Sequence, residues 1–563
     1  MKKQLIECVP NFSEGRDMSL IKQITDQIES VPGVKLLDVD PGKATNRTVV
    51  TFVGEPELVV EAAFLAIKKA SEILDMRKHK GEHPRMGATD VCPLVPVSNI
   101  SMEETARYAH QLAARVGQEL DIPVYLYESA ATSPERRNLA DVRAGEYEGL
   151  PAKLALPEWK PDYGPARFHA RAGATVIGAR DFLVAFNINL NTTSERRANS
   201  VAFDVREKGR IKRIGDPVNG EILYDEYGEP QREPGLLKSV KAIGWFIEEY
   251  GIAQISMNLT NISETPLHLA FEACAQSAES RGLRVTGSEL VGLTPLKVLL
   301  DAGKYFLQKQ RRSLGVSEEE LIKIAVRSLG LDELGPFDPK KKIIEYLLED
   351  PTNSRLVRMD LRSFSNITAS ESVAPGGGSI SAYVGALGVS LAAMVANLSS
   401  HKRQWDDRWE EFSVWAEKGQ TLKDELLRLV DEDTIAFNGI IEAFRLPKST
   451  EEEKAARSEA IQAATRVAIE TPFRVMQACY QAFDLIEAMV KKGNPNSMSD
   501  AGVGALCARA AIHGAFMNVK INLKGFKDHA YAEATVAKAT EIAAKADEWE
   551  QGIREYIHQE IEK

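Results

Sequence analysis

A short run over residues 79–88, His-Lys-Gly-Glu-His-Pro-Arg-Met-Gly-Ala, gathers two imidazoles, a carboxylate and several cations. Gly81, Pro84 and Gly87 punctuate the run, which predicts a shaped loop rather than a helix or a strand. Residues 91–97 are typical of a short strand, and their prolines indicate a sheet edge. Protonatable groups on a loop beside a strand suit general acid–base catalysis. A solvated charge run is the alternative, and spacing alone does not decide between the two.

A carboxylate in the C-terminal half is a second candidate for proton transfer. The helix expected over residues 422–444 has an apolar stripe formed by Leu422, Leu426, Leu429, Ala436, Ile440 and Ala443. Between Leu429 and Ala436, helical spacing calls for one more residue on this face, and that residue is Asp433. The pattern predicts that Asp433 faces the buried side and that Asp431 points elsewhere. Burial raises the pKa of a carboxyl group, which suits proton shuttling. A structural hydrogen bond to a neighbouring helix is the alternative.

Three other stretches have the composition of binding elements. Residues 164–173 form a loop with glycine at both ends and two arginines and a histidine inside, which favours an anionic or planar ligand. Residues 374–379, Ala-Pro-Gly-Gly-Gly-Ser, precede an apolar helix and either expose backbone N–H groups to an anion or form a flexible connection. Asn518 and Asn522 share a helix face, where core hydrogen bonds and ligand contacts are both open.

The elements that must position these residues follow a repeated order. Strands and helices succeed one another as β-α-β-β-α-β within residues 5–97 and again within residues 182–290. The recurrence predicts two similar α/β subdomains with a cleft between them. After residue 298 the strand patterns stop, and Ala-rich amphipathic stretches predict a separate helical bundle. The predicted fold is therefore α/β, with two βαββαβ subdomains, followed by an all-α domain.

Composition shifts set the predicted domain boundaries. We expect an N-terminal subdomain over 1–180, a second over 181–330, a linker rich in proline and lysine over 331–352, and a helical domain over 353–563. The apolar segment 380–398 is long enough to span a membrane. Its many Ala, Gly and Ser residues instead predict a close-packed helix inside a soluble bundle.

Composition also narrows the class of protein. The 563 residues are too many for one core and predict three or four units. A net charge of −11 and a pI of about 5.6 argue against general nucleic-acid binding. Five widely spaced cysteines without a CxxC pair indicate a reducing compartment, and no Cys or His pair has structural-zinc spacing. No signal peptide is evident, so we expect a cytoplasmic protein without a metal.

Taken together, these strings resemble the formimidoyltransferase-cyclodeaminase family over the full length and in the same domain order. The resemblance rests on residues 79–88, 164–173, 374–379 and 431–433. Further unusual strings support it: residues 7–15 (Glu-Cys-Val-Pro-Asn-Phe-Ser-Glu-Gly), 45–48 (Thr-Asn-Arg-Thr) and 185–190 (Ala-Phe-Asn-Ile-Asn-Leu).

The resemblance implies a bifunctional folate enzyme of histidine degradation and one-carbon metabolism, a transferase and a lyase in one chain. The α/β half would be a glutamate formimidoyltransferase, which moves the formimino group of N-formimidoyl-L-glutamate onto tetrahydrofolate. The helical half would be a cyclodeaminase, which closes 5-formimidoyltetrahydrofolate to 5,10-methenyltetrahydrofolate and releases ammonia. The co-substrate would include polyglutamylated folate. The resemblance also implies a homo-oligomer with dimerising helical domains.

Site residues follow from the same resemblance. The family's transferase histidine matches His83, and its cyclodeaminase carboxylate matches Asp433. Its folate-binding segment matches Gly164, Pro165, Ala166, Arg167, Phe168, His169, Ala170, Arg171, Ala172 and Gly173. Arg47 and Arg85 are candidates to hold substrate carboxylates, since the guanidinium fork matches them. A polyglutamate tail would lie on basic islands at 77–85, 136–137 and 401–403.

Two alternatives remain open from the sequence. A glutamate formyltransferase or a formyl-folate cyclising activity would use the same histidine and the same folate loop. A folate-binding protein with one inactive half is the non-catalytic alternative, and the presence of both His83 and Asp433 argues against it.

Overall fold

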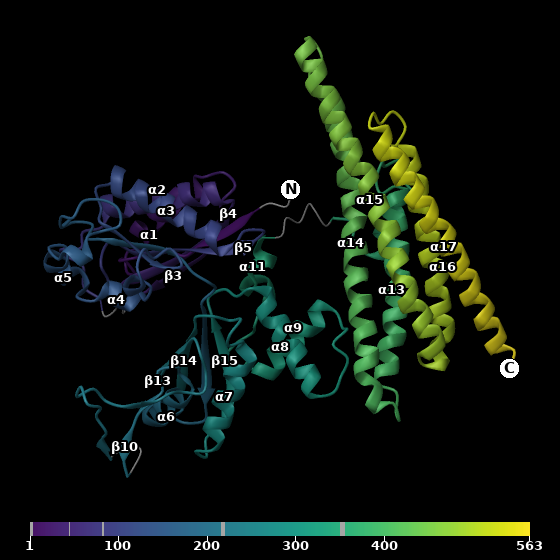
Figure 1. Cartoon of the computed structure of the whole chain (residues 1–563). Coiled ribbons are helices and arrows are strands. Elements are labelled where there is room, and N and C mark those ends of the chain that lie inside the picture. Colours follow the sequence, from purple (N-terminus) through teal and green to yellow (C-terminus); the bar gives the residue numbers. More distant parts are fainter. Residues whose placement is uncertain (1–3, 44, 82–83, 216–219, 349–354) are drawn as a thin grey trace. The chain divides into compact units, whose positions relative to one another are not determined.

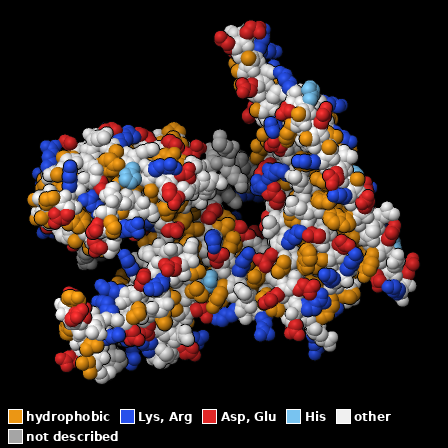
Figure 2. Space-filling model, viewed as in Figure 1, with side chains coloured by type: hydrophobic (Ala, Val, Ile, Leu, Met, Phe, Trp, Pro, Cys, Tyr) orange, Lys and Arg blue, Asp and Glu red, His pale blue; other side chains and the backbone are white. Residues whose placement is uncertain are grey.

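The computed structural model describes residues 4–43, 45–81, 84–215, 220–348 and 355–563. It forms two compact units (Figure 1). One consists of residues 1–298 with 329–348 and the other of residues 299–328 with 349–563. The first unit carries two α/β subdomains and the second is helical. Figure 2 shows Lys and Arg side chains interspersed with Asp and Glu over the visible face, so the net negative charge is not gathered in one area there.

The first subdomain is a mixed seven-stranded sheet. Its strand order is β3-β4, then β1 with β2, then β5-β7-β6. The strands are β1 (Leu5–Cys8), β2 (Asn11–Phe12), β3 (Lys35–Gly42), β4 (Arg47–Gly54), β5 (Thr89–Ser98), β6 (Val124–Glu128) and β7 (Thr175–Ala179). The pairings up to β5 are antiparallel, whereas β5–β7 and β7–β6 are parallel. The main helices are α1 (Met18–Glu29), α2 (Pro56–Ile73) and α3 (Met102–Glu119).

Short helices occupy the long connection between β6 and β7. They are η1 (Pro134–Arg136), α4 (Leu139–Arg143), α5 (Glu146–Lys153) and η2 (Pro157–Trp159). The three main helices begin where their sequences predict. Proline opens α2, and at the start of α3 the side chains of Ser101 and Glu104 each accept a hydrogen bond from the other's backbone N–H.

Strand β5 lies inside the sheet, so the prediction of an edge strand was wrong. It pairs with β1 and β2 on one side and with β7 on the other. Proline removes only the backbone donor, and the carbonyl of Pro93 still accepts the Val9 N–H at 3.1 Å. The sequence pattern did not predict β7, the strand that covers the far side of β5.

The second subdomain repeats the core of the first. Its sheet has the order β13-β14-β8-β15, fully antiparallel, which is the order of β3-β4-β1-β5. Its main elements are β8 (Val184–Leu190), α6 (Glu195–Val205), β13 (Val240–Ile247), β14 (Ile252–Leu259), α7 (Leu267–Glu279) and β15 (Val285–Val291). Two ribbons pair β9 (Arg210–Ile211) with β12 (Arg232–Glu233) and β10 (Arg213–Ile214) with β11 (Glu221–Ile222). The predicted βαββαβ repeat is confirmed.

The helical unit confirms the predicted all-α domain. Most of α8 (Leu296–Lys309) and α9 (Glu318–Leu329) belongs to this unit, whereas α10 (Pro339–Lys342) and α11 (Ile344–Leu348) belong to the first unit. The bundle helices follow along the chain. These are α12 (Leu361–Thr368), α13 (Gly377–Ser400), α14 (Trp409–Arg445), α15 (Glu451–Lys492), α16 (Met498–Asn522) and α17 (His529–Ile561), with η4 (Asp406–Arg408) and η5 (Pro495–Ser497) between them.

Small residues let α13 pack closely within the bundle, mainly against α14 and α16. A Cβ atom at Gly385 would lie 2.5 Å from the sulfur of Cys479, and one at Gly388 would lie 2.8 Å from the Gly504 carbonyl. Among the described residues, α13 alone is long and apolar enough to span a membrane, and 61% of its most apolar window is buried inside the bundle. It is the close-packed helix that the sequence predicts.

A buried carboxylate lies in the first sheet at Glu7. The side chain stands on β1 between Val53 of β4 and Val95 of β5, and only 5% of the residue is exposed. Burial raises the pKa of Glu7 to about 7, while nearby Arg180 opposes the rise and Glu345 adds to it. Glu7 therefore holds its proton more tightly in the folded protein than in the unfolded chain.

Glu7 predicts a pH-dependent stability. Because its pKa is raised by folding, its stabilising contribution is complete below pH 4.5 and is lost as the pH rises through about 7. Glu7→Gln should remove this loss and stabilise the protein at pH 8 by about 3 kcal/mol, with little effect at pH 4.5. Scanning calorimetry at both pH values measures it. Glu29→Gln, an exposed site, is the control, and equal behaviour of the two variants would contradict the assignment.

Candidate active sites

The charged loop is held by a network around Arg85. The Arg85 Nε–H donates to Nδ1 of His79 at 3.3 Å, and Nε2 of His79 lies 2.9 Å from the Asn46 carbonyl. The guanidinium also donates to Glu146 at 3.1 Å and to both oxygens of Glu148 at 2.7 and 2.9 Å. The hydrogen bond from Arg85 lowers the pKa of the Glu148 carboxyl. Arg85 is thus occupied by two carboxylates of its own chain, and its predicted role as a substrate clamp loses support.

His83, the predicted transferase catalyst, lies outside the described residues, as does Glu82. The residues on both sides are described. The Asn46 side chain accepts the Gly15 N–H at 3.0 Å and donates to the Lys80 carbonyl at 3.0 Å. The loop is therefore anchored before His83 through Asn46 and after it through Arg85. The catalytic role of His83 stays a prediction.

A segment that the sequence analysis missed joins the charged loop to the predicted folate loop. The Tyr147 N–H donates to the Arg85 carbonyl at 2.8 Å, and its hydroxyl donates to the Ala170 carbonyl at 2.5 Å. The Tyr147 ring packs at 5.3 Å from the ring of Phe168. The one signal in the sequence was the glycine at position 145. In the structure Gly145 has a φ of 87°, a conformation that glycine adopts easily, and it starts the turn that precedes Tyr147. Nothing in the local pattern indicated what this turn would contact.

Two predicted features meet where residues 164–173 pair with the end of the charged loop. The Ala88 N–H donates to the Ala172 carbonyl at 2.8 Å, and the Ala174 N–H donates to the Met86 carbonyl at 3.1 Å. A Cβ at Gly87 would lie 2.3 Å from the Ala174 carbonyl oxygen. Glycine is therefore required here by the close approach of the two backbones.

Within the predicted folate segment, three polar side chains bond to the protein itself. Arg171 donates to the Glu72 and Leu74 carbonyls and so caps the end of α2. His169 Nδ1 accepts the Ala172 N–H at 3.0 Å, and Arg167 pairs with Asp121 at 2.7 Å. These side chains hold the loop in shape. Phe168 is exposed over 36% of its surface and keeps an apolar ring at the loop. Folate binding by this segment stays a prediction.

Asp433 and the glycine-rich stretch, predicted separately, form one site. Oδ2 of Asp433 accepts the Ser379 N–H at 2.9 Å and the Ser379 hydroxyl at 3.1 Å. The Ser379 hydroxyl also lies 3.3 Å from that of Thr434. Ser379 is in the first turn of α13, where exposed N–H groups favour an anion. Burial raises the pKa of Asp433, and the two Ser379 hydrogen bonds oppose the rise. The carboxylate is thus partly buried, positioned and suited to proton transfer.

Asn518 and Asn522 both donate hydrogen bonds to backbone carbonyls of the bundle, and a ligand contact by Asn518 stays a prediction. A Cβ at Gly377 would lie 3.2 Å from Nδ2 of Asn518, which places Asn518 beside the Asp433 site. Its amide donates to the Gly514 carbonyl at 2.9 Å. Asn522 donates to the Ala468 carbonyl at 2.7 Å and makes a core hydrogen bond between α16 and α15.

The prediction that Asp431 points away from the buried side was wrong. Asp431 is 5% exposed, and its two oxygens accept the backbone N–H groups of Leu356 at 2.8 Å and Val357 at 3.2 Å. The chain before α12 covers that face of α14. Helix periodicity cannot reveal a cover that comes from a distant segment, and Asp431 is structural.

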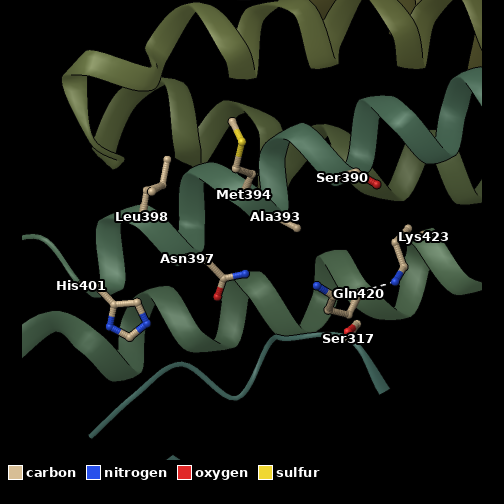
Figure 3. A pocket seen from close by; sticks show the side chains of 9 residues that line it. All are labelled: Ser317, Ser390, Ala393, Met394, Asn397, Leu398, His401, Gln420 and Lys423. Atoms are coloured by element: carbon tan, nitrogen blue, oxygen red, sulfur yellow. Dashed lines mark hydrogen bonds between the residues drawn. The ribbon is translucent and has the colours of Figure 1, made fainter. Parts of the chain in front are cut away.

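A cavity of about 430 Å³ opens elsewhere in the bundle (Figure 3). It is lined by Ser317, Ser390, Ala393, Met394, Asn397, Leu398, His401, Gln420 and Lys423. Ser390 lies eleven residues along α13 from Ser379, or about 16 Å at the helical rise. The cavity is therefore separate from the Asp433 site. Within the described ranges, no group of three or more His, Cys, Asp or Glu side chains is placed to hold a metal ion.

Comparison with known proteins covers both units. The model "Formiminotransferase domain, N-terminal subdomain" matches residues 5–180, "Formiminotransferase domain" matches 185–349, and "Formiminotransferase-cyclodeaminase" matches 360–541. The formimidoyltransferase-cyclodeaminase of Mus musculus is 44% identical over 545 residues, which cover 96% of this chain and 97% of the mouse protein. The chain belongs to the formimidoyltransferase-cyclodeaminase family. The predicted resemblance is confirmed.

Two shorter relatives match parts of this chain. The glutamate formimidoyltransferase of Streptococcus pyogenes is 44% identical over 305 residues, 54% of this chain and 94% of that protein. The methenyltetrahydrofolate cyclohydrolase of Methylorubrum extorquens is 35% identical over 201 residues, 36% of this chain and 97% of that protein. The two halves of the chain thus each match a shorter protein.

Gly378 provides a direct test of the Asp433 site. A Cβ at Gly378 would lie 2.1 Å from Oδ1 of Asp433, so Gly378→Ala must displace the carboxylate. We expect cyclodeaminase turnover to fall by about 100-fold while transferase turnover is retained. Gly376→Ala is the matched control, because its Cβ would meet nothing within 4 Å. Equal rates for the two variants with supplied 5-formimidoyltetrahydrofolate would show that the position of Asp433 is unimportant.

Proposed function

We propose that this chain transfers the formimino group of N-formimidoyl-L-glutamate to tetrahydrofolate and then cyclises the product to 5,10-methenyltetrahydrofolate with release of ammonia. The supporting observation is the pairing, in one chain, of a formiminotransferase match with a partly buried carboxylate inside the cyclodeaminase match. The first activity belongs to the α/β subdomains and the second to the helical bundle.

In the transferase half, N5 of tetrahydrofolate attacks the formimino carbon of the substrate. His83 accepts the proton that N5 loses and delivers it to the departing glutamate nitrogen, so one group serves first as base and then as acid. The anchoring of the charged loop by Asn46 and Arg85 supports this role, because a proton carrier must be held close to both nitrogens.

In the cyclodeaminase half, N10 attacks the same carbon and ammonia leaves. Asp433 takes the proton from N10 and passes it to the leaving nitrogen. Burial raises the pKa of Asp433, which makes its carboxylate a stronger base than that of an exposed aspartate, while the two Ser379 hydrogen bonds oppose the rise and fix its position. Ser379 therefore acts as a positioning residue through Asp433.

Two substitutions separate the halves. His83→Ala should reduce transferase turnover by about 10²–10⁴-fold and leave cyclodeaminase turnover intact. Asp433→Asn should abolish ammonia release from supplied 5-formimidoyltetrahydrofolate and leave glutamate release intact. A coupled assay follows methenyltetrahydrofolate absorbance, glutamate and ammonia together, and each variant is the control for the other. Normal rates in either variant would remove that residue from the mechanism.

A second candidate for the helical half is a cyclohydrolase acting on methenyltetrahydrofolate. The relative from Methylorubrum extorquens bears that name, and it favours this formyl-folate alternative over a non-catalytic role. The same assay separates the two chemistries, since a cyclohydrolase consumes methenyltetrahydrofolate without producing ammonia.

The finer partners are also part of this proposal. The folate would include polyglutamylated forms, for which Lys78 and Lys80 of the charged loop are exposed cations. Arg136 does not belong to this set, because it pairs with Asp162 at 2.6 Å and donates to the Glu158 and Lys160 carbonyls. We expect no resident metal and a cytoplasmic location, which suits five cysteines that are all free thiols.

A homo-oligomer is supported by an apolar face on the bundle. Leu387, Met394 and Leu398 are exposed on α13, and Val503 and Leu506 are exposed on α16, which packs against α13. Helical spacing of four and seven residues places the α13 members on one side. Exposed apolar side chains gathered on two packed helices favour association, and a second copy of this bundle would cover them.

Charge placed in this face should dissociate the oligomer. Leu398→Glu should raise the dissociation constant by about 30-fold or more, equivalent to ~2 kcal/mol, because the interface would bury an unpaired carboxylate. Light scattering coupled to size-exclusion chromatography measures the mass against concentration. Val414→Glu, at an exposed apolar site on α14, is the control. Identical masses for both variants and the unmodified protein would rule out this face.

A further inference from the structure

Asn518 of α16 lies against the glycine-rich start of α13, next to Asp433. A Cβ atom at Gly377 would lie 3.2 Å from Nδ2 and 3.8 Å from Oδ1 of Asn518. A Cβ atom at the following residue, Gly378, would lie 2.1 Å from Oδ1 of Asp433. Because the two glycines are consecutive and have no side chains, the amide of Asn518 and the carboxylate of Asp433 border the same turn of backbone.

A close approach of the two helices fixes Asn518 in this position. A Cβ atom at Gly514 would lie 2.3 Å from Oγ of Ser381, so α16 meets α13 there without an intervening side chain. The Ser381 hydroxyl in turn donates to the Gly377 carbonyl at 2.7 Å. Asn518 follows Gly514 by four residues and therefore lies on the same face of α16. The helix contact thus holds Asn518 against Gly377.

The two side chains each keep one oxygen atom open. Both hydrogen bonds from Ser379 go to Oδ2 of Asp433, at 2.9 and 3.1 Å. The amide nitrogen of Asn518 donates to the Gly514 carbonyl at 2.9 Å, which sets the orientation of the amide. Within the described ranges, Oδ1 of Asp433 and Oδ1 of Asn518 accept no hydrogen bond. Two acceptors are therefore left beside the same turn.

Access and bonding pattern separate Asn518 from a core residue. Gly377 is exposed, and Asn518 and Asp433 are both partly exposed, so a ligand can reach this place. The hydrogen bond of Asn518 stays within its own helix and joins no two elements. Asn522, one turn further along, instead bonds across to the Ala468 carbonyl on α15. The amide of Asn522 thus has a structural task, whereas the open oxygen of Asn518 has none.

The substrate of the proposed cyclodeaminase would bring two N–H donors to this pair of acceptors. Amidines are strong bases, so at neutral pH the formimino group of 5-formimidoyltetrahydrofolate is protonated and ends in –CH=NH2+. Hydrogen bonds from a cationic donor are stronger than those between neutral groups. A carboxylate oxygen and an amide oxygen, one on each side, suit the two N–H bonds of this nitrogen.

We propose that Asn518 is a catalytic residue of the cyclodeaminase site, with Oδ1 accepting an N–H of the leaving formimino nitrogen. The inference rests on the proposed function and adds a substrate contact to it. N10 bonds to the formimino carbon and loses its proton to Asp433. The bond from that carbon to the formimino nitrogen then breaks, and the nitrogen takes the proton from Asp433 and leaves as ammonia. The positive charge stays on the methenyl product, so protons and charge balance. Asn518 keeps the nitrogen beside Asp433 during the transfer.

Asn518→Leu tests the contact in the full-length protein, because leucine has a similar size and no acceptor. We expect kcat/KM for ammonia release from supplied 5-formimidoyltetrahydrofolate to fall by about 10- to 100-fold, since a hydrogen bond to a charged group is lost. Glutamate release by the transferase half should stay unchanged. Unaltered ammonia release in this variant would refute the contact.

5-Formyltetrahydrofolate gives a readout that a structural effect would not produce. Its formyl group ends in an oxygen atom and brings no N–H to Asn518. Its inhibition constant against ammonia release should therefore change by less than about threefold in Asn518→Leu, while kcat/KM for the formimino substrate falls. Equal weakening of the two ligands would overturn the contact.

Asn522→Leu is the matched control on the same helix face. It breaks the hydrogen bond to the Ala468 carbonyl and should lower the melting temperature without a comparable loss of kcat/KM. Equal losses of kcat/KM in the two variants would overturn the inference in favour of a structural role. Ammonia release that Asn518→Leu leaves intact keeps the proposed function and refutes the inference, whereas an unmodified protein that releases no ammonia refutes both.

Discussion

Both candidate sites depend on backbone that approaches its neighbour too closely for any side chain. In the first subdomain, the strand-like pairing of residues 86–88 with 172–174 leaves no room for a Cβ at Gly87. In the helical unit, the carboxylate of Asp433 occupies the space that a Cβ of Gly378 would need. Because glycine has no side chain, the backbone at Gly87 and Gly378 can lie directly against the neighbouring chain. Local rigidity at each site therefore comes from main-chain contact.

Local charge pairing explains how an acidic chain can serve anionic substrates. Glu146 and Glu148 neutralise Arg85, which then shapes the charged loop, and Asp90 pairs with Arg143. The net charge of the whole chain has little influence on anion binding at one site. What matters is the ratio of cations to carboxylates within a few ångströms of a buried centre, where screening by solvent is weak.

Sequence periodicity predicted the architecture well because each subdomain alternates strand and helix in a regular order. It missed β7, a five-residue strand at the end of a long loop, and therefore placed β5 at an edge. The apolar stripe of α14 predicted that Asp433 faces a neighbouring helix, and it does contact Ser379 of α13. Asp431 was misjudged because residues 356–357 cover it. Tyr147 was also missed. Its partners Arg85 and Ala170 are more than twenty residues away in the sequence, so a local pattern contains no information about them.

Helix α13 combines two spacing requirements in one continuous segment. Its first turn presents Ser379 to Asp433, and ten residues after Gly378 a second glycine, Gly388, lets α16 approach. Each residue of a helix advances the direction of its side chain by about 100°. Insertion of a single residue between the two positions would turn one of these contacts away from its partner. The length of α13 between Gly378 and Gly388 is therefore fixed. Substitutions within it can be absorbed one at a time, whereas an insertion or deletion must disrupt either the Asp433 site or the packing of the bundle.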